Sequence, residues 1–119
     1  QSERGTARKW VGKIAVTASE PSLDAPLEPQ FGRCAYFLIV DADDGSMEAV
    51  KNPGVDARGG AGVESVRTIA SKKATVLLTG KCGPSAVKAL SDAGIHVVTG
   101  CSGTVRDVVQ QYKDTPKPD

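Results

Sequence analysis

Residues 75–109 read TVLLTGKCGPSAVKALSDAGIHVVTGCSGTVRDVV, and this stretch contains one pattern twice. Each half is an apolar run that ends in Thr-Gly, followed by a short loop with one cysteine and one further glycine, and then by a helical pattern. Short apolar runs that alternate with helices are typical of parallel strands buried on both faces. The stretch therefore predicts two parallel strand–loop–helix units in an α/β domain.

The loops that follow these two strands carry residues suited to ligand binding. The first loop holds Lys81-Cys82-Gly83 and the second holds Cys101-Ser102-Gly103. In α/β proteins the loops at the carboxyl ends of parallel strands bind ligands. A helix that starts there presents backbone N–H groups and the positive end of its dipole. Two neighbouring loops of this kind predict a small anion site.

The residues before the repeated pattern predict the rest of a mixed sheet. Residues 34–41 are the most strand-like run in the chain. The turn Asp43-Asp44-Gly45 then reverses the chain, so that residues 46–51 pair with this run as a hairpin. Three prolines between residues 20 and 33 exclude regular structure there. The expected strands cover residues 13–19, 34–41, 46–51, 75–79 and 95–99, and the expected helices begin near residues 63, 84 and 104. We expect an α/β fold in which an antiparallel hairpin and parallel strands form a five-stranded mixed sheet flanked by helices.

The expected strand directions bring four loops to one edge of the sheet, which we call the rim. This follows if the first strand is parallel to the last two strands and antiparallel to the start of the hairpin. The rim loops are residues 19–34, 52–62, 81–83 and 101–103. They carry the three cysteines Cys34, Cys82 and Cys101 and the cations Arg33, Arg58 and Lys81. This convergence of thiols and positive charges points to a binding site at the rim.

The composition argues against several functional classes. Among 119 residues, 15 Lys and Arg are balanced by 14 Asp and Glu, and only 4% are aromatic, so we expect no nucleic-acid partner. No apolar run approaches the roughly 18 residues of a membrane helix, so we expect no membrane partner. Three cysteines, an odd number, argue against a disulfide framework and favour a cytoplasmic protein. We expect a monomer with a single cofactor-binding domain, residues 13–112, between a flexible tail, residues 1–12, and a second tail, residues 113–119.

Several short motifs occur in a fixed order along the chain. They are residues 13–19 (KIAVTAS), Phe31-Gly32-Arg33-Cys34, Gly59-Gly60-Ala61-Gly62, Gly83-Pro84-Ser85-Ala86, Ala93-Gly94-Ile95 and Gly103-Thr104-Val105. Each motif is weak alone, whereas the ordered set is specific. The set spans about residues 13–112 and resembles the dinitrogenase iron–molybdenum cofactor biosynthesis family.

The resemblance implies a ribonuclease H-like fold and a non-enzymatic carrier of an anionic metal–sulfur cluster. Within the family, the short chain is most similar to a member that holds a mixed molybdenum–copper sulfide cluster without covalent attachment. The iron–molybdenum cofactor or a precursor of it is the second candidate, and the resemblance also implies proteins that donate or accept the cluster. The candidate cofactor-binding residues are Gly32, Arg33, Cys34, Arg58, Gly59, Gly60, Lys81, Cys82, Gly83, Cys101, Ser102 and Gly103.

Other interpretations of the same residues stay open. A phosphate- or nucleotide-binding module would use the rim loops without needing the cysteines. A thiol redox protein would use Cys82 and Cys101, which must then lie within disulfide reach. Cys34 is the first residue of an expected strand, so it could be a buried core residue as well as a residue of the binding site. We assign no metal ligand because the chain has no C-x-x-C pair, although soft thiolate ligation by any of the three cysteines stays open.

Overall fold

The computed structural model describes residues 13–41, 45–52 and 61–114. The elements in chain order are β1 Lys13–Ala18, the 3₁₀ helix η2 Phe31–Arg33, β2 Tyr36–Asp41, β3 Met47–Lys51, α1 Ala61–Ser71, β4 Ala74–Leu78, α2 Pro84–Asp92, β5 His96–Val98 and α3 Val105–Asp114. In this part of the chain no helix has the length and apolar character needed to span a membrane.

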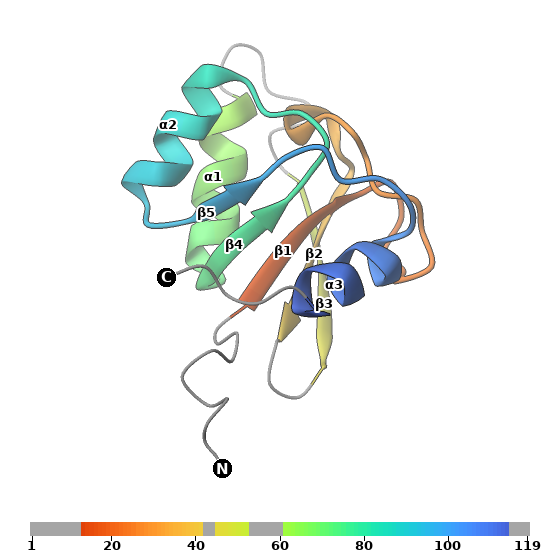
Figure 1. Ribbon diagram of the computed structural model, residues 1–119. Coiled ribbons are helices and arrows are strands. Elements are labelled where there is room, and N and C mark those ends of the chain that lie inside the picture. The colour runs from red at the N-terminus through yellow and green to blue at the C-terminus, as the bar shows by residue number, and fades with distance from the viewer. Residues whose placement is uncertain (1–12, 42–44, 53–60, 115–119) are drawn as a thin grey trace.

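The five strands form one mixed sheet in the order β3-β2-β1-β4-β5 (Figure 1). Strand β1 pairs antiparallel with β2 and parallel with β4, while β5 is parallel to β4 and β3 is antiparallel to β2. The predicted α/β fold with a mixed sheet is confirmed, and the strand order fits the ribonuclease H-like arrangement that the resemblance implied. Because β1, β4 and β5 are parallel, their carboxyl ends meet at one edge of the sheet, which is the rim.

Alternating side chains of the strands divide the core into two layers. On one face, Val105 of α3 packs in a layer with Val16 and Leu78 of the strands, and all three are fully buried. On the other face, α1 and α2 contribute Ile69 and Leu90 to a second layer. Figure 1 shows α3 on one side of the sheet and α1 beside α2 on the other. The loops at the rim therefore lead to helices on opposite faces.

The proline-rich segment between β1 and η2 is tied along the rim by hydrogen bonds. The Leu27 N–H donates to the Gly103 carbonyl at 2.9 Å, and the Phe31 N–H donates to the Lys81 carbonyl at 3.0 Å. Between these points, the buried hydroxyl of Thr17 donates to a carbonyl of the same segment at 2.7 Å. The segment thus contacts both loops of the repeated pattern, and it holds η2 against the loop between β4 and α2.

Three local features differ from the prediction. Residues 31–33 form a 3₁₀ turn, because one such turn needs only a single i→i+3 hydrogen bond and begins after the last proline. Strand β2 starts at Tyr36 because Cys34 caps η2 and is fully buried. On α2, the spacing of Val87 and Leu90 predicts that both side chains face inward, and Leu90 is fully buried whereas Val87 is 38% exposed. Helix α2 therefore packs through a narrower face than its spacing suggested.

Candidate functional site

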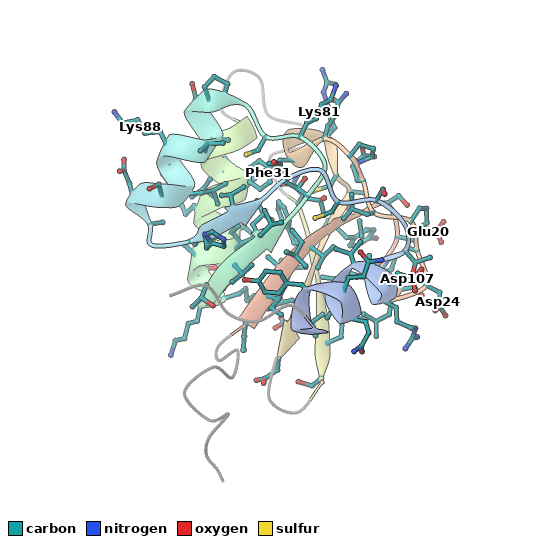
Figure 2. All side chains as sticks on the ribbon, viewed as in Figure 1. Glu20, Asp24, Phe31, Lys81, Lys88 and Asp107 are labelled. Carbon is teal, nitrogen blue, oxygen red and sulfur yellow. The ribbon has the colours of Figure 1, made fainter. Side chains whose placement is uncertain are left out.

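A hollow of about 420 Å³ opens at the rim between η2 and the start of α2. This hollow, which we call the α2 hollow, is lined by Gln30, Phe31, Gly32, Arg33, Lys81, Gly83, Ser85 and Ala86. Figure 2 shows Lys81 and Phe31 at this end of the molecule. The fold therefore joins two segments that lie far apart in the sequence, the η2 turn and the loop between β4 and α2, around one space.

The α2 hollow is positively charged. Arg33 and Lys81 are exposed, and neither forms an ion pair with another described residue. Gly83 is the N-cap of α2 and supplies no side-chain hydrogen bond to the helix. The backbone N–H groups of Ser85 and Ala86 have no hydrogen-bond partner within the described part of the chain. The hollow thus offers two cations and two unpaired backbone donors, which is the chemistry that binds an anion.

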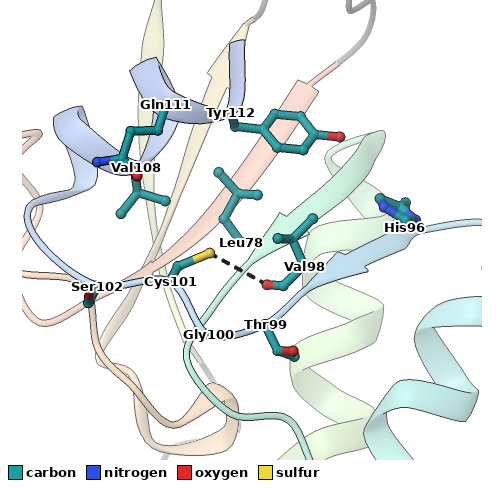
Figure 3. Close-up of a pocket in the computed structure, with 10 residues that line it drawn as sticks. All are labelled: Leu78, His96, Val98, Thr99, Gly100, Cys101, Ser102, Val108, Gln111 and Tyr112. Carbon is teal, nitrogen blue, oxygen red and sulfur yellow. Dashed lines mark hydrogen bonds between the residues drawn. The ribbon is translucent and has the colours of Figure 1, made fainter. Parts of the chain in front are cut away.

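A second hollow, of about 480 Å³, lies on the opposite face between α3 and strands β4 and β5 (Figure 3). This β5 hollow is lined by Leu78, His96, Val98, Thr99, Gly100, Cys101, Ser102, Val108, Gln111 and Tyr112. The Cys101 thiol donates to the Val98 carbonyl at 3.7 Å, and the Tyr112 ring extends over Leu78 (Figure 3). None of its lining residues is Lys, Arg, Asp or Glu. An anion in the β5 hollow would therefore find no Lys or Arg there, and only the imidazole of His96 among basic side chains.

The start of α3 does not offer the free donors that the sequence predicted. The N–H groups of Val105 and Arg106 donate to carbonyls of the segment before η2 at 2.9 and 2.8 Å. Thr104 and Asp107 have the three-residue spacing of a helix cap, and the Asp107 N–H donates to the Thr104 hydroxyl at 3.2 Å. Figure 2 also shows the carboxylates of Asp24 and Asp107 at this end of α3. The backbone donors that the sequence predicted to be free at this helix start are therefore already paired with the proline-rich segment.

The three cysteines have different surroundings. Cys34 is fully buried, and its thiol donates to the Phe31 carbonyl at 3.3 Å. Cys82 is half-buried against the core layer of α1 and α2, whereas Cys101 is half-buried against the layer of α3. The side chains of Cys82 and Cys101 therefore lie on opposite faces of the sheet. This placement does not favour the disulfide pair that a thiol redox protein would need.

Burial also keeps the thiols protonated. It raises the pKa of the Cys34 thiol to about 12, and it raises the pKa of Cys82 and of Cys101 above their ordinary value. The thiolate is the nucleophile and the metal-binding form of cysteine, so none of the three is activated by its surroundings. Among the described residues, no three His, Cys, Asp or Glu side chains form a group suited to a metal ion.

The raised pKa of Cys34 predicts a loss of stability at alkaline pH. Below about pH 9 the thiol is protonated in both the folded and the unfolded chain, whereas between about 9 and 12 only the folded chain keeps the proton. Unfolding then releases a proton, so the free energy of unfolding should fall by up to about 1.4 kcal/mol per pH unit from this one group. Urea unfolding at pH 8, 10 and 11 measures this slope.

The matched comparison is Cys34→Ala against Cys101→Ala. The first variant should show a shallower decline above pH 9, while the second should change the slope less, because Cys101 is only half-buried. Tyr112, whose pKa burial raises to about 12, contributes to the decline in every variant above pH 10. Equal slopes for the parent chain and Cys34→Ala would contradict the assignment.

The structure divides the predicted site residues into groups. The α2 hollow is lined by Gly32, Arg33, Lys81 and Gly83, and the β5 hollow is lined by Cys101 and Ser102. The core layer of α1 and α2 contains Cys34 and Cys82. The Gly103 carbonyl accepts a hydrogen bond from the Leu27 N–H. Arg58, Gly59 and Gly60 lie outside the described residues. The sequence thus predicted one site at the rim, whereas the described rim holds two separate hollows.

Sequence reasoning missed four residues of the α2 hollow. They are Gln30, Phe31, Ser85 and Ala86. A signal for the last two was present, since proline at the first position of a helix marks the N–H groups just after it as unpaired. Phe31 begins one of the ordered motifs, but its place in the hollow depends on the long-range hydrogen bond to Lys81, which no local signal records.

Comparison with known proteins finds relatives over most of the chain. A family model described as dinitrogenase iron-molybdenum cofactor matches residues 12–115. The apo form of the orange protein from Desulfovibrio gigas is 39% identical with a TM-score of 0.83, over 92% of this chain and 99% of that one. A putative NifB protein from Thermotoga is 28% identical with a TM-score of 0.76, over 86% and 87% of the two chains. An uncharacterised protein of Methanocaldococcus jannaschii is 26% identical over 89 residues, 72% of this chain and 75% of that protein.

Proposed function

The chain belongs to the dinitrogenase iron-molybdenum cofactor family, and we propose on this premise that it binds and carries an anionic metal–sulfur cluster in the α2 hollow. The observation that carries the proposal is the convergence of Arg33, Lys81 and the uncapped start of α2 on one space. The cluster is cargo in this proposal, and the protein acts as a carrier and not as an enzyme.

The residues of the α2 hollow suit such a cargo. A cluster of metal and sulfide is large, soft and anionic, so it needs positive charge, backbone donors and room for close approach. A side chain on Gly32 or Gly83 would meet no atom within 4 Å, so the chain leaves open space at both positions. Arg33 adds planar donors and Lys81 a mobile point charge. These groups hold an anion without a covalent bond from the protein.

We propose a mixed molybdenum–copper sulfide cluster as the first candidate cargo, with the iron–molybdenum cofactor or a precursor as the second. The similarity to the orange protein supports the first, and the description of the family supports the second. In both cases the cluster brings its own sulfide ligands, so no cysteine has to coordinate a metal. The raised pKa of the thiols agrees with this non-covalent mode. Proteins that load or receive the cluster complete the proposal.

The uncapped start of α2 also supports a second candidate function. A phosphate group fits unpaired N–H groups at a helix start with two cations beside it. A phosphate- or nucleotide-binding module would therefore use the same hollow. The two functions differ in what the hollow retains: a thiometalate cluster in one case, and phosphate in the other.

Amide mapping tests the proposal directly. Addition of tetrathiomolybdate and copper(I) to the ¹⁵N-labelled protein under anaerobic conditions should shift the amide signals of residues 32–33, 81–83 and 85–86 together. A matched titration with inorganic phosphate should produce smaller shifts at the same concentration. Visible absorption of the washed protein would show that the coloured cluster is retained.

Two outcomes would contradict the proposal. Shifts confined to residues 98–102 and 108–112 would place the cluster in the β5 hollow. Equal shifts with phosphate, and no coloured species after washing, would favour the phosphate-binding module.

A further inference from the structure

Asn52 is a buried polar residue directly after β3, and it is not among the site residues that the sequence predicted. Only 1% of its surface is exposed. Its side-chain N–H group donates to the Cys34 carbonyl at 2.9 Å and lies 3.6 Å from the Cys34 thiol. Its side-chain oxygen accepts a hydrogen bond from the Ser65 hydroxyl of α1 at 2.9 Å. One carboxamide therefore joins three parts of the fold: the end of β3, helix α1 and the segment before β2.

The contact with Cys34 reaches the α2 hollow through η2. Cys34 is the C-cap of η2, and its thiol donates back to the Phe31 carbonyl at 3.3 Å. The residues between them, Gly32 and Arg33, line the hollow. Asn52 also donates from its backbone N–H to the Ala35 carbonyl at 2.9 Å, so it holds the chain on the far side of Cys34 as well.

The η2 turn is thus held from two sides. On the side of the hollow, the Phe31 N–H donates to the Lys81 carbonyl at 3.0 Å. On the inner side, Phe31 packs against the ring of Phe37 with centroids 5.6 Å apart, and Asn52 holds Cys34. The aromatic contact anchors the first residue of the turn. Two side-chain contacts hold its end, where Arg33 leaves the turn: the Cys34 thiol donates to the Phe31 carbonyl, and the Asn52 carboxamide ties Cys34 itself to β3 and α1.

A buried amide is an inefficient way to stabilise a core. Each of its polar groups must be desolvated, and the net gain per hydrogen bond is modest, whereas an apolar side chain of similar volume avoids the cost. A fully satisfied polar network does fix one geometry, because its groups pair in only one arrangement. The Asn52 network is therefore better suited to fixing the position of the groups that it joins than to stabilising the fold.

We propose that Asn52 is a positioning residue that sets Gly32 and Arg33 at the wall of the α2 hollow. The inference rests on the proposed function of that hollow. It assigns to Asn52 no contact with the cargo. Removal of the Asn52 side chain lets the end of η2 move, so that the Arg33 guanidinium and the space at Gly32 are no longer held opposite Lys81.

The test compares the affinity of three variants for a mixture of tetrathiomolybdate and copper(I). Asn52→Ala should bind about 10-fold more weakly, which corresponds to the loss of one well-placed charged contact. Ser65→Ala keeps both contacts of Asn52 with Cys34 and should change the affinity less than about 2-fold. Val40→Ala removes buried volume from the core layer on the opposite face, so it should lower the melting temperature without weakening binding.

Amide hydrogen exchange supplies a readout that does not depend on the cargo. In Asn52→Ala the Arg33 amide, which donates to the Gln30 carbonyl at 3.1 Å, should exchange faster, while the amides of β1 and β4 keep their protection. Should Asn52→Ala not fold, Asn52→Ser provides the same test with a smaller change in polarity, and the same weakening of binding is expected.

The outcomes separate the two levels of the proposal. Parental affinity in Asn52→Ala, together with loss of affinity in Arg33→Gln, would overturn the positioning role and leave the site in place. Parental affinity in both variants would overturn the proposed site itself. Equal weakening in Asn52→Ala and Val40→Ala would mean that general destabilisation explains the effect, and it would also overturn the positioning role.

Discussion

Replacement of both Arg33 and Lys81 by glutamine is expected to weaken retention of a tetrathiomolybdate–copper(I) assembly about 150-fold, because two charge-assisted contacts contribute roughly 1.5 kcal/mol each. Both side chains line the α2 hollow, and both are exposed without a described ion-pair partner. Their charges are therefore available to an anion in the hollow. The metal-to-protein ratio after gel filtration and the visible spectrum, both under anaerobic conditions, measure the retention.

The same double variant should fold almost as stably as the parent chain, since exposed charges contribute roughly 0–1 kcal/mol to folding. The matched control is Lys13→Gln with Lys88→Gln, which changes the net charge equally at positions away from the α2 hollow; Figure 2 shows Lys88 on α2, apart from Lys81. The control should retain the assembly. Equal retention by the two double variants would mean that Arg33 and Lys81 are ordinary solvated surface charges that do not bind the assembly.

The repeated pattern allowed the sheet to be predicted because its signals are local. An apolar run followed by Thr-Gly marks where a strand ends, and Pro84 and Thr104 mark where the next helices begin. The turn after residue 41 fixes the hairpin in the same way. With the first strand taken as parallel to the last two strands, the position of the rim follows from geometry. The hairpin, the mixed sheet and the edge that carries the loops were therefore within reach of the sequence, whereas the order of the strands in the sheet was not predicted.

The division of the rim into two hollows was not predictable in this way. Lys81 and Cys101 follow equivalent strands in equivalent motifs, and periodicity alone does not say that the first helix packs on one face and the second on the other. The occupation of the α3 start by the segment before η2 depends on pairings such as that of Val105 with Ala25. These contacts join residues about 80 positions apart, and no local pattern records them. The link from Asn52 to Cys34 spans only 18 positions, and the register of the β2–β3 hairpin brings the two residues together.

Gly80 shows how tightly the α2 hollow is built into the rim. A Cβ at this position would lie 2.7 Å from the Pro29 carbonyl oxygen and 2.8 Å from the Pro29 Cα, both of them backbone atoms. The Lys81 N–H also donates to the same carbonyl, and the Phe31 N–H donates to the Lys81 carbonyl. The segment before η2 therefore lies directly on a glycine, and these hydrogen bonds require that close approach.

Gly80→Ala is expected to destabilise the fold by about 3 kcal/mol, at the upper end of the cost of overpacking, because backbone and not a flexible side chain must move. This corresponds to a change of roughly 150-fold in the folding equilibrium. Displacement of the segment would also break its hydrogen bonds with Lys81 and shift η2. Urea unfolding measures the loss as a lower midpoint at an unchanged m-value.

The comparison that isolates the close contact is Gly32→Ala. Gly32 lies in η2, on the segment that is hydrogen-bonded to Lys81, the residue after Gly80. A Cβ on Gly32 meets no atom within 4 Å, so this variant should lie within about 0.5 kcal/mol of the parent chain. The two variants add the same methyl group to the same edge of the sheet, and they differ only in what that group meets. Equal unfolding midpoints for Gly80→Ala and Gly32→Ala would mean that the segment moves aside without cost. The η2 wall of the α2 hollow would then not be fixed by its contact with β4.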